Sequence, residues 1–348
     1  MKDDTNFIKG RGAQFNPHNR FQKNEVELDA VENAETQYIM GYPKTIVNKV
    51  ESPDIYASYS MNPYQGCEHG CIYCYARNSH EYWGYSAGQD FENKIIIKQN
   101  APQLLEDFFN KKNYKPAIIM LSGNTDCYQP IERKMKITRG LLEVLVKYRH
   151  PVGMITKNSL ITRDIDLLKE LAANDLVHVT ISLTTLSEEL RRKMEPRASS
   201  FHNRLKIVEE LSKEGIPVGV LMGPMIPSLN SHEIPEILKA AAAAGANYAG
   251  MVPVRLQGAI GGIFEDWITK TFPDRAQKVM NQIRDMHDGE LSSSRYQQKM
   301  KGNGKMAEQL FALFKVSHKK YFRERESHTL RTDLFRVPDK GGQLSMEF

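Results

Sequence analysis

The chain has 348 residues, of which 41% are hydrophobic and 26% are charged, and its formal net charge is +5. This is the composition of a globular protein with a sizeable core, and it excludes wholesale disorder, a collagen-like repeat and a coiled-coil rod. No apolar run approaches the roughly 18–20 residues of a membrane span and no secretory signal is visible, so we expect a cytoplasmic protein without a membrane partner.

The predicted elements begin with an N-terminal extension. Residues 1–55 are mostly polar and look like an extension rather than a core element. From about Ser58 onward, short apolar runs rich in β-branched residues recur, each followed by a stretch with helical spacing. The predicted strands lie near Ser58–Asn62 and at Ala117–Leu121, Val152–Thr156, Val177–Ser182, Val218–Met222 and Tyr248–Val252.

Helical patterns fill the intervals between these strands. Thr162 and Asp164 can cap the helix through Leu171, and Ser231 can cap the next helix. Gly215 and Gly245 stand where helices should stop. Alternating β and α elements predict an α/β fold with a parallel sheet wrapped by helices. About six units are too few for a complete eight-stranded barrel, which leaves a partial barrel or a doubly wound sheet.

After Gly258 the pattern becomes mostly helical, and we expect these helices to pack on the barrel or close one side of it. The C-terminal tail holds the whole charge excess, because residues 290–348 contain 12 Lys and Arg against 7 Asp and Glu. A positive patch can attract phosphates. A solvated helix face is the commoner meaning of such a charge run.

Three of the four cysteines, Cys67, Cys71 and Cys74, lie within one window of eight residues. Thiols at this spacing can converge on one soft metal centre if the backbone loops around it. Gly66 and Gly70 supply the unusual backbone angles that such a loop needs. Thiolates select zinc or iron–sulfur clusters over hard cations.

Two kinds of metal site remain open at this point. A structural zinc site needs four ligands and would have to recruit His69 or Cys127. Three thiolates instead fit a [4Fe–4S] cluster in which one iron is left open for a substrate or cofactor. Inert buried cysteines are the third and least favoured interpretation.

With Tyr73 just before the last cysteine, this window resembles the C-x3-C-x-aromatic-C signature of radical S-adenosylmethionine (radical SAM) enzymes. It follows the first predicted strand, where that superfamily places it. The segments 10–13, 124–132 and 195–197 resemble a bacterial radical SAM family of unassigned substrate. That family is similar to spore photoproduct lyase and is often labelled DNA repair photolyase.

The resemblance implies a partial (β/α)6 TIM-like barrel. We expect an N-terminal extension at 1–55, the barrel at 56–258, and a helical C-terminal region with the basic tail at 259–348. It also implies a [4Fe–4S] cluster held by Cys67, Cys71 and Cys74, with S-adenosylmethionine chelating the open iron. Reductive cleavage of that cofactor would give a 5′-deoxyadenosyl radical, which abstracts hydrogen from a substrate. The chemistry belongs to the cofactors, and the protein supplies orientation and a water-poor cavity.

The ends of the predicted strands are where such a barrel places its site. The turn after the second barrel strand meets the methionine amino group in this superfamily, usually through a Gly-Gly-Glu-like sequence. Here Asn124, Thr125 and Asp126 stand in its place, and they are either substitutes or a capped turn of small polar residues. Lys157 ends the third strand and can meet the cofactor carboxylate or a substrate anion, or be an exposed loop lysine.

The resemblance points to four further cofactor contacts. Tyr73 belongs to the motif itself. Ser182 ends the fourth strand, where a hydroxyl often meets the ribose. Arg197 suits the cofactor carboxylate, unless it pairs with Glu195 or Glu188. Met222 ends the fifth strand, where apolar contact with adenine is expected. A buried core methionine is the alternative for this position. The four predicted contacts are Tyr73, Ser182, Arg197 and Met222.

Other aromatic residues crowd the cysteine window. They can shield a cluster from oxygen and water, or Tyr75 and Trp83 can stack against a base. Cys127 directly follows Asp126. In spore photoproduct lyase a cysteine in this region returns hydrogen to the substrate radical, so Cys127 is a candidate hydrogen donor, with an ordinary buried cysteine as the alternative.

We therefore predict a radical SAM enzyme with an unidentified substrate, possible nucleic acid chemistry of the photoproduct-lyase type, and an electron donor of flavodoxin or ferredoxin type. The alternative function is a zinc-stabilised nucleic-acid-binding protein without catalysis. Fold alone does not fix the substrate, since one barrel supports reactions on nucleic acids, peptides and small metabolites.

Overall fold

The computed structural model describes residues 8–21, 35–52, 57–293, 298–323 and 329–338. Parts of the predicted extension and of the C-terminal region lie outside these residues. Among the described residues, no helix is both long enough and apolar enough to cross a bilayer.

Seven strands of the described chain form the main sheet, in the spatial order β10, β9, β8, β7, β6, β3 and β2. Of these, β3 to β10 run parallel, and β2 is antiparallel to β3. Spatial order follows chain order without the reversal that marks a doubly wound sheet, so the sheet is a partial (β/α)6 barrel. The strands are β2 (Val47–Lys49), β3 (Tyr59–Met61), β6 (Ile119–Leu121), β7 (Val152–Thr156), β8 (Val177–Ser182), β9 (Val218–Met225) and β10 (Tyr248–Pro253).

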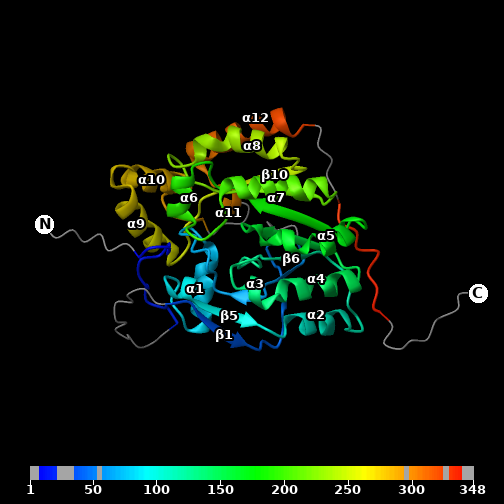
Figure 1. Ribbon diagram of the computed structural model, residues 1–348. Coiled ribbons are helices and arrows are strands. Elements are labelled where there is room, and N and C mark those ends of the chain that lie inside the picture. The colour runs from blue at the N-terminus through cyan, green and yellow to red at the C-terminus, as the bar shows by residue number, and fades with distance from the viewer. Residues whose placement is uncertain (1–7, 22–34, 53–56, 294–297, 324–328, 339–348) are drawn as a thin grey trace, which may run out of the picture.

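Helices cover one side of this sheet, and Figure 1 shows them stacked from α2 and α4 at the bottom to α8 and α12 at the top. The longer helices present an apolar stripe to the sheet, as α4 does with Leu141 and Leu145, both fully buried. The crossover helices are α2 (Ala101–Phe109), α3 (Glu132–Met135), α4 (Ile137–Lys147), α5 (Ile165–Ala172), α6 (Glu188–Met194), α7 (Phe201–Lys213) and α8 (Ile234–Ala243).

Helix ends follow the sequence only in part. Gly215 and Gly245 end α7 and α8 with φ of +74° and +94°, which confirms both predicted stops. Asp164 occupies the N-cap position of α5, but none of the three predicted side chains makes a cap hydrogen bond. Asp164 precedes α5, but its carboxylate accepts hydrogen bonds from Arg139, at 3.0 Å, and from Tyr128 instead of capping the helix. Ser231 lies in a short 3₁₀ turn before α8 and makes no side-chain cap.

A second sheet joins β1 (Gln37–Gly41), β5 (Lys94–Lys98) and β4 (Tyr64–Gln65) in that order. It includes part of the predicted extension, since β1 pairs in parallel with β5 and β2 extends the main sheet. Ala13 is also fully buried. The expectation that residues 1–55 form no core element is therefore wrong for the described part.

The C-terminal region is helical, as predicted. It contains α9 (Ile260–Thr271), α10 (Pro273–Asp285), α11 (Gln298–Lys301) and α12 (Gly304–Tyr321). α12 packs against α8 and β10. α9 reaches α6, where the indole Nε1 of Trp267 donates to the carbonyl of Lys193 at 3.1 Å. This region therefore covers the far edge of the barrel.

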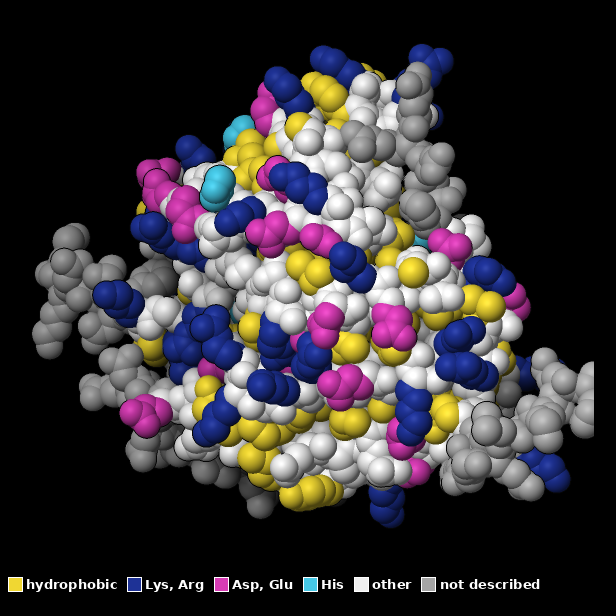
Figure 2. Space-filling view, turned by 45° about the vertical axis from the view of Figure 1, so that its right-hand side comes forward, with side chains coloured by type: hydrophobic (Ala, Val, Ile, Leu, Met, Phe, Trp, Pro, Cys, Tyr) yellow, Lys and Arg dark blue, Asp and Glu magenta, His cyan; other side chains and the backbone are white. Residues whose placement is uncertain are grey.

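Charges of both signs are mixed on one face of the molecule. Figure 2 shows a face on which Lys and Arg side chains alternate with Asp and Glu. On α12, Lys315, Lys319 and Lys320 are exposed, as on a solvated helix face, and Arg331 of the tail pairs with Asp333 at 2.7 Å.

Candidate functional site

The cysteine window forms a loop after β3 and β4, at the carboxyl edge of the main sheet. Gly66 and Gly70 have φ of +80° and +66°, as the sequence predicted. The loop is fastened from two sides: Cys67 N donates to the carbonyl of Phe91 at 2.8 Å, and Ile72 N donates to the carbonyl of Met194 at 3.0 Å. These two backbone hydrogen bonds hold the loop in shape.

The N-terminal segment, residues 8–21, is bound to the outside of this loop through the buried carboxylate of Glu92. Its two oxygens accept the backbone N–H groups of Gly12 and Ala13 at 2.9 and 2.7 Å. One oxygen also pairs with Arg77 at 2.5 Å, and Arg77 Nε donates to the carbonyl of Cys71 at 3.0 Å. Glu92 and Arg77 therefore tie the N-terminal segment to the cysteine loop, and sequence reasoning missed both.

Gly12 lies so close to the loop that it has no room for a side chain. A Cβ built on Gly12 would lie 1.9 Å from the carbonyl oxygen of Gly70. We expect Gly12→Ala to lower the free energy of unfolding by about 1–3 kcal/mol, because the backbone of one segment must move. Urea unfolding of the variant against the parent protein measures this.

The matched control is Gly262→Ala in α9, where a Cβ meets nothing within 4 Å. Its change should be small and of stabilising sign, since alanine favours a helix over glycine. Equal effects of the Gly12 and Gly262 substitutions would show that the N-terminal segment does not rest on the cysteine loop.

The three thiols are free. Cys67 and Cys71 are buried and Cys74 is half-buried. Burial raises the pKa of the Cys67 thiol. The charges of Asp126 and then of Cys71 and Cys74 raise it further. Burial also raises the pKa of Cys71 to about 12, with Lys157 acting against it. These thiols therefore lie within range of one another's charge, and a bound metal would have to deprotonate them.

The donor set fits a cubane cluster. In the described part of the chain, no three His, Cys, Asp or Glu side chains are drawn together as ligands of one metal ion. A cubane instead offers each thiolate its own iron. His69, the proposed zinc ligand, has both ring nitrogens engaged: Nδ1 lies 3.3 Å from Asp126 and Nε2 lies 3.2 Å from Asn158 Nδ2.

Lys157, directly after β7, directs its ammonium toward the cysteine loop. The nitrogen lies 6.0 Å from the centre of the Tyr73 ring, and it makes no hydrogen bond or ion pair with any residue that the structure describes. Burial would lower the pKa of Lys157, but Cys71 and Glu195 raise it above its usual value. Lys157 is therefore a cation beside the thiols that pairs with no carboxylate in the described part of the chain.

Glu195 lies behind this lysine in a buried network that sequence reasoning did not find. Its carboxylate accepts hydrogen bonds from the hydroxyls of Tyr73 and, at 2.6 Å, Thr184, and it pairs with Arg204. Burial would raise the pKa of Glu195, but Arg204 and then Lys157 lower it to about 2. The Tyr73 hydroxyl is thus committed to Glu195, which fixes the ring beside Lys157.

The turn after β6 is built as a capped polar turn. Asp126 accepts hydrogen bonds from the Thr156 hydroxyl at 2.7 Å and from Lys157 N at 2.8 Å. Burial opposes its ionisation, but His69 and these donors hold the pKa of Asp126 at about 2. Thr125 donates to the carbonyl of Tyr64 at 2.9 Å. The three polar residues of the turn, Asn124, Thr125 and Asp126, are engaged within the protein.

The remaining predicted cofactor residues are spread apart. Ser182 is buried, and its carbonyl accepts from Arg204 at 3.0 Å. Met222 is fully buried in the hydrophobic core. Arg197 donates to the carbonyl of Gly10 at 3.1 Å and lies 3.8 Å from Glu68, so the alternative pairing with Glu195 or Glu188 is wrong. The cofactor roles of all three stay predictions.

Cys127 is fully buried in the core. Its N–H donates to the Ser122 hydroxyl at 2.7 Å, and its carbonyl accepts from Thr138 at 2.6 Å. Burial raises the pKa of the thiol, followed by the charge of Asp126. The structure therefore places Cys127 among packed side chains, and its hydrogen-donor role stays a prediction.

A short helix closes the carboxyl edge between the first and last barrel strands. It is the 3₁₀ helix η1 (Tyr75–Trp83), which directly follows Cys74. Tyr75 donates its hydroxyl to the carbonyl of Gly123 after β6, and Asn78 Nδ2 donates to the carbonyl of Gln257 after β10, at 2.7 Å. Burial of the hydroxyl and the charge of Cys74 raise the pKa of Tyr75, whereas the charges of Arg255 and Lys157 act to lower it.

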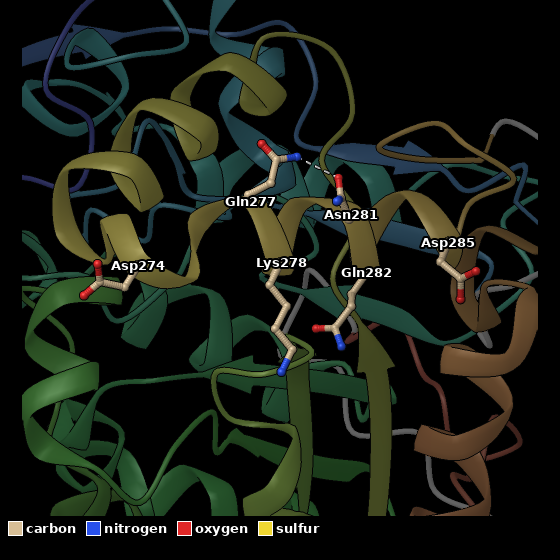
Figure 3. Close-up of a pocket in the computed structure, with 6 residues that line it drawn as sticks. All are labelled: Asp274, Gln277, Lys278, Asn281, Gln282 and Asp285. Atoms are coloured by element: carbon tan, nitrogen blue, oxygen red, sulfur yellow. Dashed lines mark hydrogen bonds between the residues drawn. The ribbon is translucent and has the colours of Figure 1, made fainter.

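A separate hollow of about 590 Å³ lies over α10, lined by polar side chains of that helix alone. Figure 3 shows these side chains, with Gln277 bonded to Asn281 at 2.8 Å and Lys278 pointing the other way. It includes no predicted site residue. The lining residues are Asp274, Gln277, Lys278, Asn281, Gln282 and Asp285.

Known proteins resemble this chain over the segment that contains the cysteine loop. Residues 61–241 match the sequence profile of the Radical SAM superfamily. An uncharacterised protein of Mycobacterium bovis is 30% identical over 244 residues, covering 69% of this chain and 72% of the relative. A protein of Pseudomonas phage M6 named radical SAM Nalpha-GlyT isomerase is 27% identical, covering 53% of this chain and 37% of the relative.

Among solved structures, spore photoproduct lyase complexed with dinucleoside spore photoproduct aligns with a TM-score of 0.61 at 15% identity, covering 82% of this chain and 79% of that chain. At this identity the likeness shows a shared fold. The matched segment, 61–241, is more than half of the 348 residues, and the match does not favour a non-catalytic zinc protein. The chain belongs to the radical SAM superfamily, whose enzymes bind a [4Fe–4S] cluster and S-adenosylmethionine.

Proposed function

We propose that Cys67, Cys71 and Cys74 hold the [4Fe–4S] cluster and that Lys157 binds the carboxylate of S-adenosylmethionine. The observation that carries this is the set of three free thiols in one glycine-hinged loop, beside a lysine that has no acidic partner among the described residues. A guanidinium or ammonium group beside the open iron suits a carboxylate. Arg197, the other predicted partner, instead contacts the N-terminal segment.

The chain's own residues orient and protect this site. When bound, the cluster and its cofactor supply hydrogen-atom abstraction from an unactivated C–H bond. Tyr73, fixed by Glu195, forms one wall beside Lys157, and Asp126 holds the backbone N–H of Lys157. Glu92 and Arg77 fasten the loop from outside. The loop, the buried network and the N-terminal segment together keep water from the thiols of Cys67 and Cys71, which are buried.

We further propose lyase-type chemistry on a nucleic acid. Support comes from the fold shared with spore photoproduct lyase, whose solved structure holds a dinucleoside spore photoproduct. The phage relative named radical SAM Nalpha-GlyT isomerase belongs to the same superfamily. Reduction of the cluster needs an electron donor, for which a flavodoxin- or ferredoxin-like protein is the proposed partner.

Anaerobic reconstitution with iron and sulfide tests the metal assignment. The proposal requires about four irons and four sulfides per chain and a brown chromophore. Stoichiometric zinc without iron, after reconstitution with both metals present, would contradict it and favour the zinc-stabilised alternative. Isothermal titration with S-adenosylmethionine then compares the parent with Lys157→Gln, which should bind the cofactor more weakly at unchanged iron content.

A further inference from the structure

Arg255 is a cation at the mouth of the barrel. It follows β10, the last strand of the main sheet, and is half-buried. Its guanidinium carbon lies 5.2 Å from the centre of the Tyr75 ring. Among the residues that the structure describes, it has no hydrogen bond and no ion pair. An arginine held over an aromatic ring keeps its donors available for an anion.

Three arginines of the surrounding segments are already paired with carboxylates. Arg204 pairs with Glu195, Arg77 with Glu92, and Arg20 with Glu81 at 3.1 Å. Lys157 also lacks an acidic partner among the described residues, and the proposed function assigns it to the cofactor. The charge of Arg255 is therefore left over for the substrate.

Exposed aromatic side chains continue from Tyr75 along η1. Tyr75, Tyr82 and Trp83 are 49%, 72% and 43% exposed, which is unusual for side chains of this size. Phe21 of the N-terminal segment lies on Tyr82 with ring centres 4.8 Å apart, and it is itself 52% exposed. Aromatic rings that stack bases, combined with cations that meet phosphates, are the common means of binding single-stranded nucleic acid.

We propose that Arg255 binds a backbone phosphate of a single-stranded nucleic acid at the barrel mouth, with η1 as the surface along which the strand lies. This rests on the proposed function and adds to it a named substrate contact. A guanidinium presents paired donors that match the two free oxygens of a phosphodiester. Tyr75, bonded to Gly123, keeps the guanidinium between the last strand and the cysteine loop.

The test measures binding of a fluorescein-labelled oligothymidylate of about ten nucleotides, within the ~4–16 nucleotides of single-strand sites. Anisotropy is followed on the reconstituted protein over a range of salt concentrations. We expect Arg255→Gln to weaken binding about tenfold and to reduce the salt slope by about 0.7, the value for one phosphate contact on a single strand. Arg255→Lys, which keeps the charge, should retain most of the slope.

Arg192→Gln is the matched control, because Arg192 is exposed on α6 and paired with Glu188 at 3.3 Å. It should leave both affinity and slope unchanged. An oligothymidylate with neutral methylphosphonate linkages should bind the parent and Arg255→Gln equally. Thymidine monophosphate is added as a competitor, to distinguish binding of a terminal phosphate from binding of a phosphodiester within a chain. The proposal requires that unlabelled oligothymidylate displaces the labelled strand and that thymidine monophosphate does not.

The proposal is overturned if the oligonucleotide does not bind, if Arg255→Gln changes nothing, or if a polyglutamate of equal charge binds through Arg255 instead. Iron content and cofactor cleavage are measured on the same samples. Normal cleavage without oligonucleotide binding would reject the phosphate site alone, whereas failure to form the cluster would reject the proposed function. Circular dichroism on each variant confirms that the fold is retained.

Discussion

Cys71→Ala is expected to reduce cleavage of S-adenosylmethionine at least about a thousandfold, because the three thiolates act as a unit and loss of one costs about as much as loss of all. Cys71 is the central thiol of the loop, and its pKa responds to both Lys157 and Cys74. Iron per chain after anaerobic reconstitution should fall well below the four of a complete cubane. Iron analysis and formation of 5′-deoxyadenosine are the two measurements.

Cys127→Ala is the matched control, since it removes a thiol of the same kind from the buried core. It should keep full iron content and cofactor cleavage, with a loss of unfolding free energy of about 1 kcal/mol. If Cys127 is the hydrogen donor, the product distribution changes once a substrate is known; an unchanged distribution rejects that role. Loss of iron in Cys127→Ala but not in Cys71→Ala would contradict the assigned ligands.

Glu195→Gln is expected to lower the free energy of unfolding by roughly 3–5 kcal/mol, the cost of leaving a buried charge unpaired. Arg204 is 2% exposed and Glu195 is fully buried, so neither can be rescued by water. The Tyr73 hydroxyl also loses its charged acceptor. Urea unfolding at pH 7 measures the change, and Glu189→Gln, an exposed carboxylate on α6, should change it by less than about 0.5 kcal/mol.

The same carboxylate predicts the response of the protein to acid. The pKa of Glu195 is lowered in the folded state to about 2, and so is that of Asp126. A lowered pKa gives stability that is fully present above the unfolded value of about 4, and that is lost as the pH falls toward 2. The parent should therefore lose stability across this range, and Glu195→Gln should lose less. Parallel curves for both proteins would contradict the Arg204–Glu195 pair.

The parallel sheet was predictable because its strands are buried runs. β7 and β8 match the predicted ranges residue for residue, and β9 extends three residues further, to Met225. The second sheet was not predictable. β1 exposes Tyr38 and Met40, and it becomes a strand only by pairing with β5, which lies over fifty residues further along the chain. A pattern of local burial carries no information about such a partner.

The candidate site divides in the same way. Three cysteines, an aromatic residue and two glycines lie within nine residues, so their spacing alone predicts the loop. The carboxylates that support the loop could not be predicted in this way. Glu92 contacts Gly12 across 80 residues of sequence, and Glu195 contacts Tyr73 across 122. The Gly-Arg-Gly-Ala segment was the available signal for Glu92, since Gly12 marks a close approach of two backbones.

Anaerobic incubation of the reconstituted, reduced protein with S-adenosylmethionine tests the central claim most directly. Single-stranded DNA, RNA and peptide pools are supplied in parallel, so that a requirement for substrate is met. The account predicts 5′-deoxyadenosine in amounts that depend on Cys67, Cys71 and Cys74, with the nucleic-acid pools giving more than the peptide pool. No 5′-deoxyadenosine in any pool, at full cluster occupancy, would contradict it.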